Sequence, residues 1–253
     1  MNSAFVTGAT GGIGRSIVEA LTARGMSVHA IGRQKKTLQA LEQKTGCHVH
    51  CLDLSNIEAV QRLVEKSAVD ILINCAGCGA APGPLQATPT AAIDAVVDVN
   101  FRAPLHLIAS VIPGMLDRGR GHIINIGSIA GLYPIPNSAV YAASKSGIHA
   151  LSSLLRLDLK GSPIKVTEIC PGRVETNFFA TITGDAKTAQ ETYFDDYKSL
   201  QPDDITSTVL FALDAPTHVN ISMIELSPQG QVFGGIDFAP KKHLKDFKKP
   251  KRF

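Results

Sequence analysis

The sequence predicts a single α/β domain built on a doubly wound, parallel sheet of seven strands with helices on both faces. Short apolar runs bounded by Gly, Pro, Asn or Asp alternate with segments of helical spacing, a pattern that indicates strands alternating with helices. Several runs, such as Ile71-Leu72-Ile73, are apolar throughout and so predict strands buried on both faces. At 253 residues, 44% apolar and 19% charged, the chain is long enough to bury such a core without disulfides.

The elements follow from these runs in order. Strands are expected at residues 3–7, 26–31, 48–52, 70–74, 122–126, 164–169 and 222–226. Helices are expected over residues 15–23 and 138–160; Ser55 with Glu58 indicates a capping box, and Thr88-Pro89 an N-cap followed by proline at the first helical position. The segments 77–83 and 171–197 are loop-like. Because ligands bind outside the carboxyl ends of parallel strands, both are expected to cover a binding site.

The positive charge of the chain lies at its C-terminal end. The formal net charge is +3, but residues 241–253 contain six Lys, one Arg and one Asp, which leaves −3 for residues 1–240. We therefore expect one domain over residues 1–240 and a basic tail over 241–253. An acidic body argues against a nucleic-acid-binding face. The tail is interpreted as a solubilising segment or a clamp on a neighbouring subunit of an acidic oligomer.

Cysteine usage and hydropathy predict a cytoplasmic protein. The five cysteines, at positions 47, 51, 75, 78 and 170, are too few and too irregular for a disulfide framework. The sequence has no basic leader before its first apolar run and no uninterrupted apolar stretch of about 18 residues, so neither a signal peptide nor a membrane span is expected.

The first strand leads into a glycine-rich turn, Thr7-Gly8-Ala9-Thr10-Gly11-Gly12-Ile13-Gly14, which opens directly into a helix. One glycine suits the tight turn, a second lets backbone N–H groups approach a pyrophosphate, and a third lets helix and strand pack closely. The N-terminus of the helix supplies an anion site. This strand-turn-helix context predicts a Rossmann-type dinucleotide site, with a structural tight turn as the alternative.

The residues after the second and third strands predict which dinucleotide binds. An acidic residue after the second strand would hold the ribose hydroxyls of NAD, but Gly32-Arg33 stands there, and a guanidinium suits a 2′-phosphate. Arg33, helped by Lys36, is therefore predicted to select NADP(H), with a solvated surface arginine as the alternative. Asp53 is expected to accept a hydrogen bond from the adenine amino group, or else to be a turn residue before Ser55.

A second group of residues carries acid-base chemistry. Tyr141 and Lys145 lie four apart on one predicted helix face, and Ser128 follows the fifth strand. The ordinary pKa of a phenol, near 10, is too high for a base at neutral pH. A neighbouring ammonium and an oxidised nicotinamide would lower the pKa of Tyr141, and Ser128 would hydrogen-bond the substrate oxygen.

These motifs together resemble those of the short-chain dehydrogenase/reductase family, from Ser3 to about Val232. The motifs are Thr7-Gly8-x-x-x-Gly12-x-Gly14, Asn74-Cys75-Ala76-Gly77, Asn100, Ser128, Tyr141-x-x-x-Lys145 and Pro171-Gly172 with Thr176. The resemblance implies that Tyr141 is the general acid/base, Ser128 orients the carbonyl, Lys145 also holds the nicotinamide ribose and Asn100 anchors a water in a proton relay. It also implies a homotetramer. Cofactor contacts are expected from Gly8, Thr10, Gly12, Ile13, Gly14, Arg33, Asp53, Leu54, Asn74, Ala76, Gly77, Tyr141, Lys145, Pro171, Gly172, Val174 and Thr176.

The chain departs from the family pattern at two positions. Cys75 replaces the second Asn of the Asn-Asn-Ala-Gly motif, and Gly11 stands where many NADP-preferring members carry a basic residue. NADP(H) preference therefore rests mainly on Arg33.

A finer resemblance is to bacterial NADP-dependent 3-hydroxy acid dehydrogenases and their sulfoacetaldehyde-reducing relatives. It rests on residues 121–128, 155–161 and 218–221 with Glu225, which are mostly scaffold positions. The substrate is expected to be a small 3-hydroxy acid or a short polar aldehyde that contacts Ser128 and Tyr141. The rest of its pocket is expected to come from the segments 77–81, 131–137 and 173–179, in which Arg173 is the cation placed to meet an anionic group. A solvent-facing role is the alternative for Arg173, and Phe178 and Phe179 form either a lid or lid packing.

Other interpretations were weighed against this one. The cysteines and histidines of residues 47–51 alternate along a strand, so they point to opposite faces and predict no zinc site. Cys75-x-x-Cys78 begins at a strand end rather than a helix start, which disfavours a redox pair. A reductase of 3-ketoacyl thioesters or of bulky ketones would use the same four catalytic residues. A nucleotide-binding sensor would have no chemical need for them.

Overall fold

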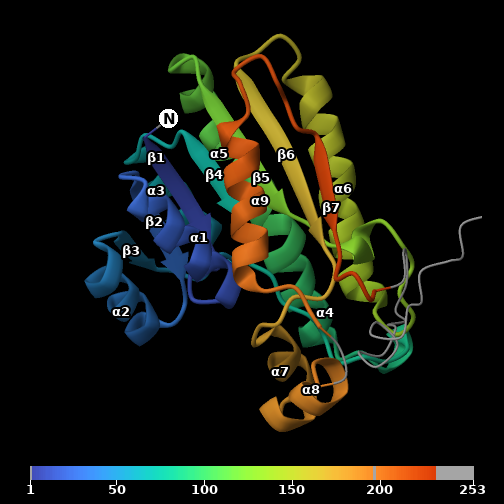
Figure 1. The fold of residues 1–253 in the computed structure, drawn as a ribbon. Coiled ribbons are helices and arrows are strands. Elements are labelled where there is room, and N and C mark those ends of the chain that lie inside the picture. Colours follow the sequence, from blue (N-terminus) through green and yellow to red (C-terminus); the bar gives the residue numbers. More distant parts are fainter. Residues whose placement is uncertain (1, 196–197, 232–253) are drawn as a thin grey trace, which may run out of the picture.

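The seven predicted strands form one parallel sheet, as Figure 1 shows. The computed structural model describes residues 2–195 and 198–231. The strand order is β3-β2-β1-β4-β5-β6-β7, and each neighbouring pair is parallel. The strands are β1 (Ser3–Thr7), β2 (Ser27–Gly32), β3 (His48–Cys51), β4 (Ile71–Asn74), β5 (Gly121–Ile126), β6 (Ile164–Pro171) and β7 (Met223–Leu226). This confirms the predicted fold class.

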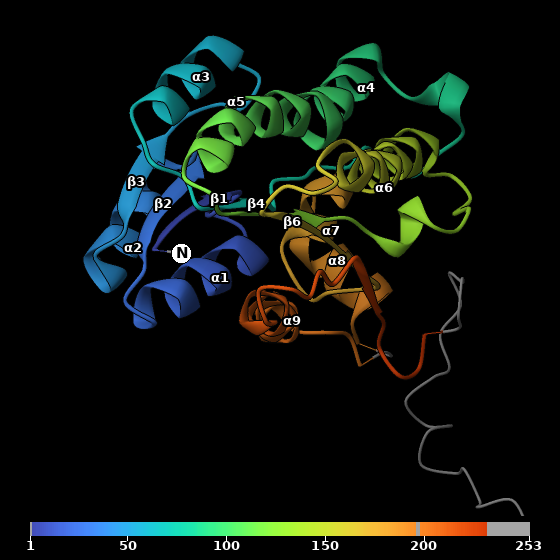
Figure 2. The same cartoon turned by 90° about the horizontal axis from the view of Figure 1, so that it is seen from above.

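Helices cover both faces of the sheet and enclose two apolar cores, as seen from above in Figure 2. Because side chains alternate along a strand, Ala4 and Val6 of β1 face one core while Phe5 faces the other. The first core is covered by α1 (Gly12–Ala23), α2 (Lys35–Thr45) and α9 (Pro202–Asp214), and the second by α3 (Ile57–Glu65), α5 (Ala103–Asp117) and α6 (Ala139–Asp158).

Three local expectations were wrong. The N-cap of α3 is Asn56, whose side chain accepts a hydrogen bond from the amide of Ala59, whereas Ser55 hydrogen-bonds Asp53. Helix α4 (Thr90–Val97) begins one residue later than expected, with Pro89 as its N-cap. The segment expected as a loop over 171–197 contains α7 (Phe178–Thr183) and α8 (Ala186–Tyr193), which lie beyond the carboxyl ends of the strands in Figure 1.

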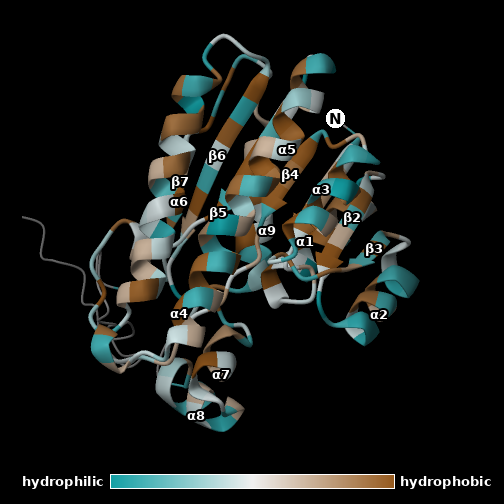
Figure 3. Cartoon of the chain, turned by 180° about the vertical axis from the view of Figure 1, so that it is seen from behind, coloured by the Kyte–Doolittle hydropathy of each residue, from teal (hydrophilic) through white to brown (hydrophobic). Residues whose placement is uncertain are grey.

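The helical run from Thr90 to Asp117 joins α4 and α5 through a π-helical turn, Asp98–Arg102. By length and composition alone its 28 residues meet the requirement for crossing a membrane, although the sequence predicts no span. Its buried side chains, including those of Leu107, Val111 and Met115, pack in the second core. Figure 3 shows apolar segments along α5 and α6, where Leu105, Leu154 and Leu157 are exposed.

The strand carrying the predicted cysteine-histidine motif separates its side chains as expected. Cys47 and Val49 pack in the first core. His50 lies on the other face, where its Nε2 is 2.9 Å from Nδ1 of His29. The basic tail at 241–253 lies outside the described residues.

Buried His122 predicts a pH-dependent stability. Its Nε2 donates to Oγ1 of Thr167, which itself donates to the carbonyl of Ile221, so the lone pair is left on a buried Nδ1 without a partner. Burial, followed by the charge of Lys165, lowers the pKa of His122 to about 4. Since this pKa lies below that of an unfolded histidine, near 6.5, stability is present above pH 6.5 and is lost as the pH falls toward 4.

The test is His122→Gln, which retains a donor toward Thr167 but does not titrate. Between about pH 7 and pH 4, the variant should lose about 3 kcal/mol less unfolding free energy than the wild type, as measured by chemical denaturation. An equal loss in both proteins would contradict this assignment.

Candidate active site

A cavity of about 720 Å³ lies at the carboxyl ends of the strands. Its walls come from the glycine turn after β1, the ends of β2 and β3, the segment after β4, the N-terminal part of α6 and the segment from Pro171 to Ile182. The two segments expected to cover a site, 77–83 and 171–197, both contribute to it, the second through residues 171–174, 176–179, 181, 182 and 193. The cavity therefore lies where the topology of a parallel sheet places a ligand.

The glycine turn forms a cradle that side chains would fill. Gly8 has φ +69°, in the left-handed region that favours glycine. A Cβ on Gly14 would overlap the carbonyl oxygen of Gly8, and one on Gly12 would lie 3.1 Å from Cγ2 of Thr176. Gly11 caps α1 without a side-chain hydrogen bond, and the first turn of α1 carries no acidic residue. No carboxylate or capping side chain of the first turn therefore occupies the free N–H groups at the N-terminus of α1. These groups are those that would bind a pyrophosphate.

Arg33 and Asp53 lie together at the cavity wall. The Arg33 side chain is 70% exposed, and its Nη1 lies 3.9 Å from Oδ2 of Asp53. Hydrogen bonds from the amide and hydroxyl of Ser55, followed by the charge of Arg33, lower the pKa of Asp53. An ionised acceptor and an exposed guanidinium therefore border the same part of the cavity, whereas Lys36 is not among its lining residues.

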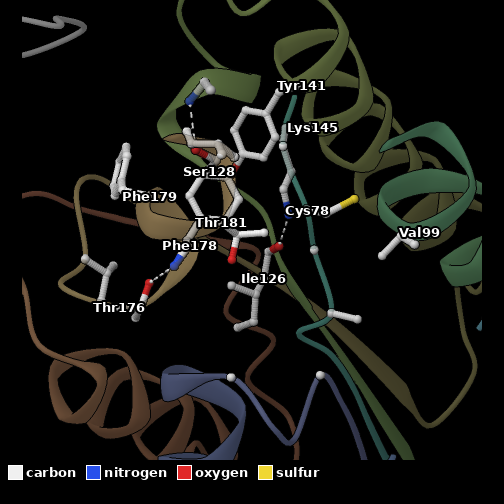
Figure 4. Close-up of a pocket in the computed structure, with 18 of the residues that line it drawn as sticks. Cys78, Val99, Ile126, Ser128, Tyr141, Lys145, Thr176, Phe178, Phe179 and Thr181 are labelled. Carbon is white, nitrogen blue, oxygen red and sulfur yellow. Dashed lines mark hydrogen bonds between the residues drawn. The ribbon is translucent and has the colours of Figure 1, made fainter. Parts of the chain in front are cut away.

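Ser128, Tyr141 and Lys145 meet at the cavity, as Figure 4 shows. Ser128 follows β5 and caps a short 3-10 helix, Ile129–Gly131, where its Oγ accepts from the amide of Ala130. Tyr141 and Lys145 lie one helical turn apart on α6. The Nζ of Lys145 donates to the carbonyl of Ile126 at 2.8 Å and lies 5.9 Å from the centre of the Tyr141 ring.

The protein surroundings alone do not make Tyr141 a base. Burial raises its pKa to about 12, and a hydrogen bond with Ser128 acts in the opposite direction. The lowering that the sequence predicts is therefore not produced by Lys145 by itself. A phenol with this pKa is fully protonated at neutral pH, which suits it to donate a proton to a developing alkoxide.

Asn100 braces the site from the π-helical turn. Its Oδ1 accepts from the amide of Cys78 at 2.8 Å, and its Nδ2 donates to the Cys78 carbonyl at 2.9 Å. The Nδ2 also reaches Oγ of Ser144, which neighbours Lys145 in the sequence. The Asn100 side chain is buried outside the cavity wall and holds the segment after β4 in place. A π-turn of this kind is frequent at functional sites.

Aromatic side chains from α7 and α8 cover the cavity above Tyr141. The ring of Phe178 lies 5.4 Å from that of Tyr141, and Phe179 stacks on Tyr193 at 4.2 Å. The guanidinium of Arg173 lies 5.2 Å from the Tyr193 ring and 5.8 Å from the Phe179 ring, and donates to the Tyr193 carbonyl. Arg173 lines the cavity while holding this aromatic cover together.

Most of the other expected residues line the cavity, apart from Asn74, Glu175 and part of the segment 131–137. Asn74 is not in the wall, because its buried side chain donates to Asn125 in the neighbouring strand. Of the segment 131–137, only residues 135–137 line the cavity, because Gly131 packs against the backbone of Lys145. Thr181, Ile182 and Tyr193 also line it; they lie in the segment 171–197 that was expected to cover the site, but were not singled out. The helices that carry them, α7 and α8, are short and were not predicted.

A glycine cradle at a helix N-terminus and a Ser-Tyr-Lys group in the same cavity define a dinucleotide-dependent dehydrogenase. Residues 2–187 match the model of the family described as short chain dehydrogenase, and the chain belongs to this family. It is an oxidoreductase with the Rossmann-like fold predicted from the sequence.

Individual relatives bear out the finer resemblance. The chain is 36% identical over 241 residues to the NADP-dependent 3-hydroxy acid dehydrogenase of Salmonella typhi, covering 92% of this chain and 97% of that protein. It is 32% identical to sulfoacetaldehyde reductase 2 of Chromohalobacter salexigens, covering 92% and 96%. The closed form of serine dehydrogenase complexed with NADP+ superposes with a TM-score of 0.89 at 33% identity, covering 94% of this chain and all of that one.

The glycine cradle gives a matched pair of substitutions. Gly14→Ala places a Cβ on the Gly8 carbonyl, and should lower the free energy of unfolding by about 2 kcal/mol or more. In Gly11→Ala the added Cβ lies 3.4 Å from the same oxygen, an ordinary contact, and the loss should stay below about 1 kcal/mol. Denaturant titration of both variants is the measurement. Equal losses would show that the close approach at Gly14 does not constrain the turn.

Proposed function

We propose that this protein is an NADP(H)-dependent oxidoreductase that interconverts a carbonyl and an alcohol by hydride transfer. The observation that carries the proposal is the meeting of Ser128, Tyr141 and Lys145 in the same cavity as the glycine cradle. When bound, the nicotinamide supplies or accepts the hydride. The chain's own residues then orient the carbonyl, exclude water and move the proton.

Tyr141 is the general acid/base of this scheme. In the reducing direction its protonated phenol donates to the substrate oxygen as negative charge develops there, and Ser128 donates a hydrogen bond to the same oxygen. Lys145, held by the Ile126 carbonyl, places its ammonium beside the phenol and stabilises the phenolate that remains. When the cofactor is bound, Lys145 would also hold the nicotinamide ribose. Asn100 anchors a water that returns the proton to the site.

Arg33 is the residue that favours NADP(H) over NAD(H). Its exposed guanidinium at the cavity wall suits a 2′-phosphate, and Asp53 beside it is an acceptor for the adenine amino group. Gly8, Thr10, Gly12, Ile13 and Gly14 hold the pyrophosphate side of the cofactor. The names of the 3-hydroxy acid dehydrogenase and of the serine dehydrogenase complex support the same cofactor.

The substrate is a small 3-hydroxy acid or a short polar aldehyde. The ring of Phe178 lies 5.4 Å from that of Tyr141 and so borders the space beside the phenol, which supports a small substrate over an acyl thioester or a bulky ketone. Arg173 supplies a cation in the wall that suits a carboxylate or sulfonate. The names of the 3-hydroxy acid dehydrogenase and sulfoacetaldehyde reductase relatives agree with an anionic substrate.

The active form is a cytoplasmic homotetramer that uses the outer faces of α5 and α6. Leu154 is 56% and Leu157 69% exposed on α6, and Leu105 and Leu116 are exposed on α5. Burial of such side chains between subunits is the usual reason for an apolar helix face on a water-soluble domain.

The catalytic assignment is tested by Tyr141→Phe. With a panel of 3-keto acids, sulfonated and other short aldehydes, bulky ketones and acyl thioesters, kcat/KM for NADPH oxidation should fall about 1000-fold, because the acid is lost. The matched control is Tyr133→Phe, whose hydroxyl donates to Glu225 away from the cavity wall and whose kcat/KM should stay within about threefold. Unchanged turnover in Tyr141→Phe would overturn the assignment, and tight NADPH binding without turnover of any carbonyl would favour a sensor.

The cofactor assignment is tested by Arg33→Ala. Loss of a charge-assisted contact should weaken NADPH binding about 10- to 100-fold and leave NADH binding nearly unchanged, as measured by fluorescence titration of both nucleotides. Lys36 was expected to help Arg33 but does not line the cavity, so Lys36→Ala, which removes an equal charge, should change neither affinity by more than about twofold at physiological salt. The selector would be misassigned if Arg33→Ala kept the wild-type ratio of affinities.

A further inference from the structure

A buried carboxylate lies behind the catalytic group, at a position that the sequence analysis did not single out. Glu168 of β6 is 1% exposed. Its Oε2 accepts a hydrogen bond from Nδ1 of His149 at 2.7 Å, and the thiol of Cys170 on the same strand also hydrogen-bonds the carboxylate. His149 lies on α6, four residues after Lys145 and eight after Tyr141, so the three side chains follow one another along one side of the helix.

The carboxylate sits against the strand end that carries the catalytic serine. A Cβ on Gly127, the residue before Ser128, would lie 2.5 Å from Oε1 of Glu168. Ile126, the residue before Gly127, accepts a hydrogen bond from the Lys145 ammonium through its carbonyl. Gly127 therefore leaves room for a negative charge directly behind the segment that fixes Lys145.

The Lys145 ammonium has little else to balance its charge. It is buried, it donates to a neutral carbonyl, and no ion pair involves it within the described residues. Burial lowers the pKa of Lys145; the groups that act against this are, in decreasing order of effect, Cys75, Cys170, Glu168 and Cys78. Burial raises the pKa of all three thiols, which keeps them neutral, and Glu168 is the one carboxyl group among these four.

We propose that Glu168 is a positioning residue of the active site: its carboxylate, fixed by His149, is the counter-charge that keeps Lys145 protonated beside Tyr141. The inference rests on the proposed function, because it concerns the proton on the lysine that the function requires. Glu168 is hydrogen-bonded to His149 of α6 and to Cys170 of β6 itself, and its charge acts on Lys145 of α6. Glu225 of β7 is paired in register with Cys170, and its carboxylate accepts from Tyr133.

The test uses Glu168→Gln, which keeps the shape of the side chain and removes its charge. The apparent pKa of Lys145 is measured in the enzyme without substrate by competitive acetylation at a series of pH values, read by mass spectrometry. We expect it to fall by about one unit, and the alkaline limb of kcat/KM for carbonyl reduction to move to lower pH by the same amount.

Two further variants control for structural effects. Glu225→Gln removes another carboxylate near the same sheet edge and should leave the Lys145 titration unchanged. The double variant Glu168→Gln/His149→Gln is neutral at both positions and keeps a hydrogen bond between them. It therefore tests the effect of the Glu168 charge even if the single variant folds poorly. It should titrate like Glu168→Gln.

An unchanged Lys145 titration in both Glu168 variants would overturn the proposal, as would an equal shift in Glu225→Gln. Because acetylation needs no substrate, this outcome is separate from failure of the proposed function. That failure would appear as a wild-type enzyme that reduces no carbonyl while Lys145 titrates as expected.

Discussion

The hydrogen bond from Lys145 to the carbonyl of Ile126 joins the two elements that make this site. Ile126 ends β5, a strand with all six residues buried, and Lys145 lies in the second turn of the 20-residue helix α6. The close packing of Gly131 against the Lys145 backbone ties the segment between them to the same point. With this contact fixed, Tyr141 lies one turn before Lys145 on α6, and Ser128 lies two residues after the end of β5. The phenol of Tyr141, the ammonium of Lys145 and the hydroxyl of Ser128 are thereby brought together by the two elements that carry them.

Burial determines which chemistry the group performs. It keeps the phenol of Tyr141 protonated, with a pKa of about 12, and it disfavours the charge on Lys145. A protonated tyrosine suits carbonyl reduction, whereas alcohol oxidation needs an additional positive charge nearby, which an oxidised nicotinamide would supply. The same burial makes a carboxylate such as Glu168 effective without a direct ion pair, because charges are poorly screened where water is excluded. The rings of Phe178 and Phe179 add apolar surface to the wall of the cavity.

The strands and the principal site residues could be predicted because each leaves a local pattern. Apolar runs define the sheet, the spacing of Gly8, Gly12 and Gly14 defines the turn, and the four-residue interval between Tyr141 and Lys145 defines a helix face. Contacts between elements distant in sequence leave no such pattern, which is why the pair His149–Glu168 and the bond from Asn74 to Asn125 were not foreseen. The helices over 178–193 were missed because they are short and cover the site rather than packing on the sheet. At α3, Ser55 and Asn56 are both suitable caps, and the hydrogen bonds of Asp53 to Ser55 leave Asn56 to cap the helix.

The central claim is that one cavity brings a dinucleotide to the Ser128-Tyr141-Lys145 group. A crystal structure of the protein with NADP+ tests it most directly. We expect the pyrophosphate at the amides of residues 12–14, the 2′-phosphate against Arg33, and the nicotinamide ribose within hydrogen-bond distance of Lys145 and Tyr141. A nucleotide bound elsewhere, or one whose nicotinamide ribose lies out of reach of Lys145, would contradict it.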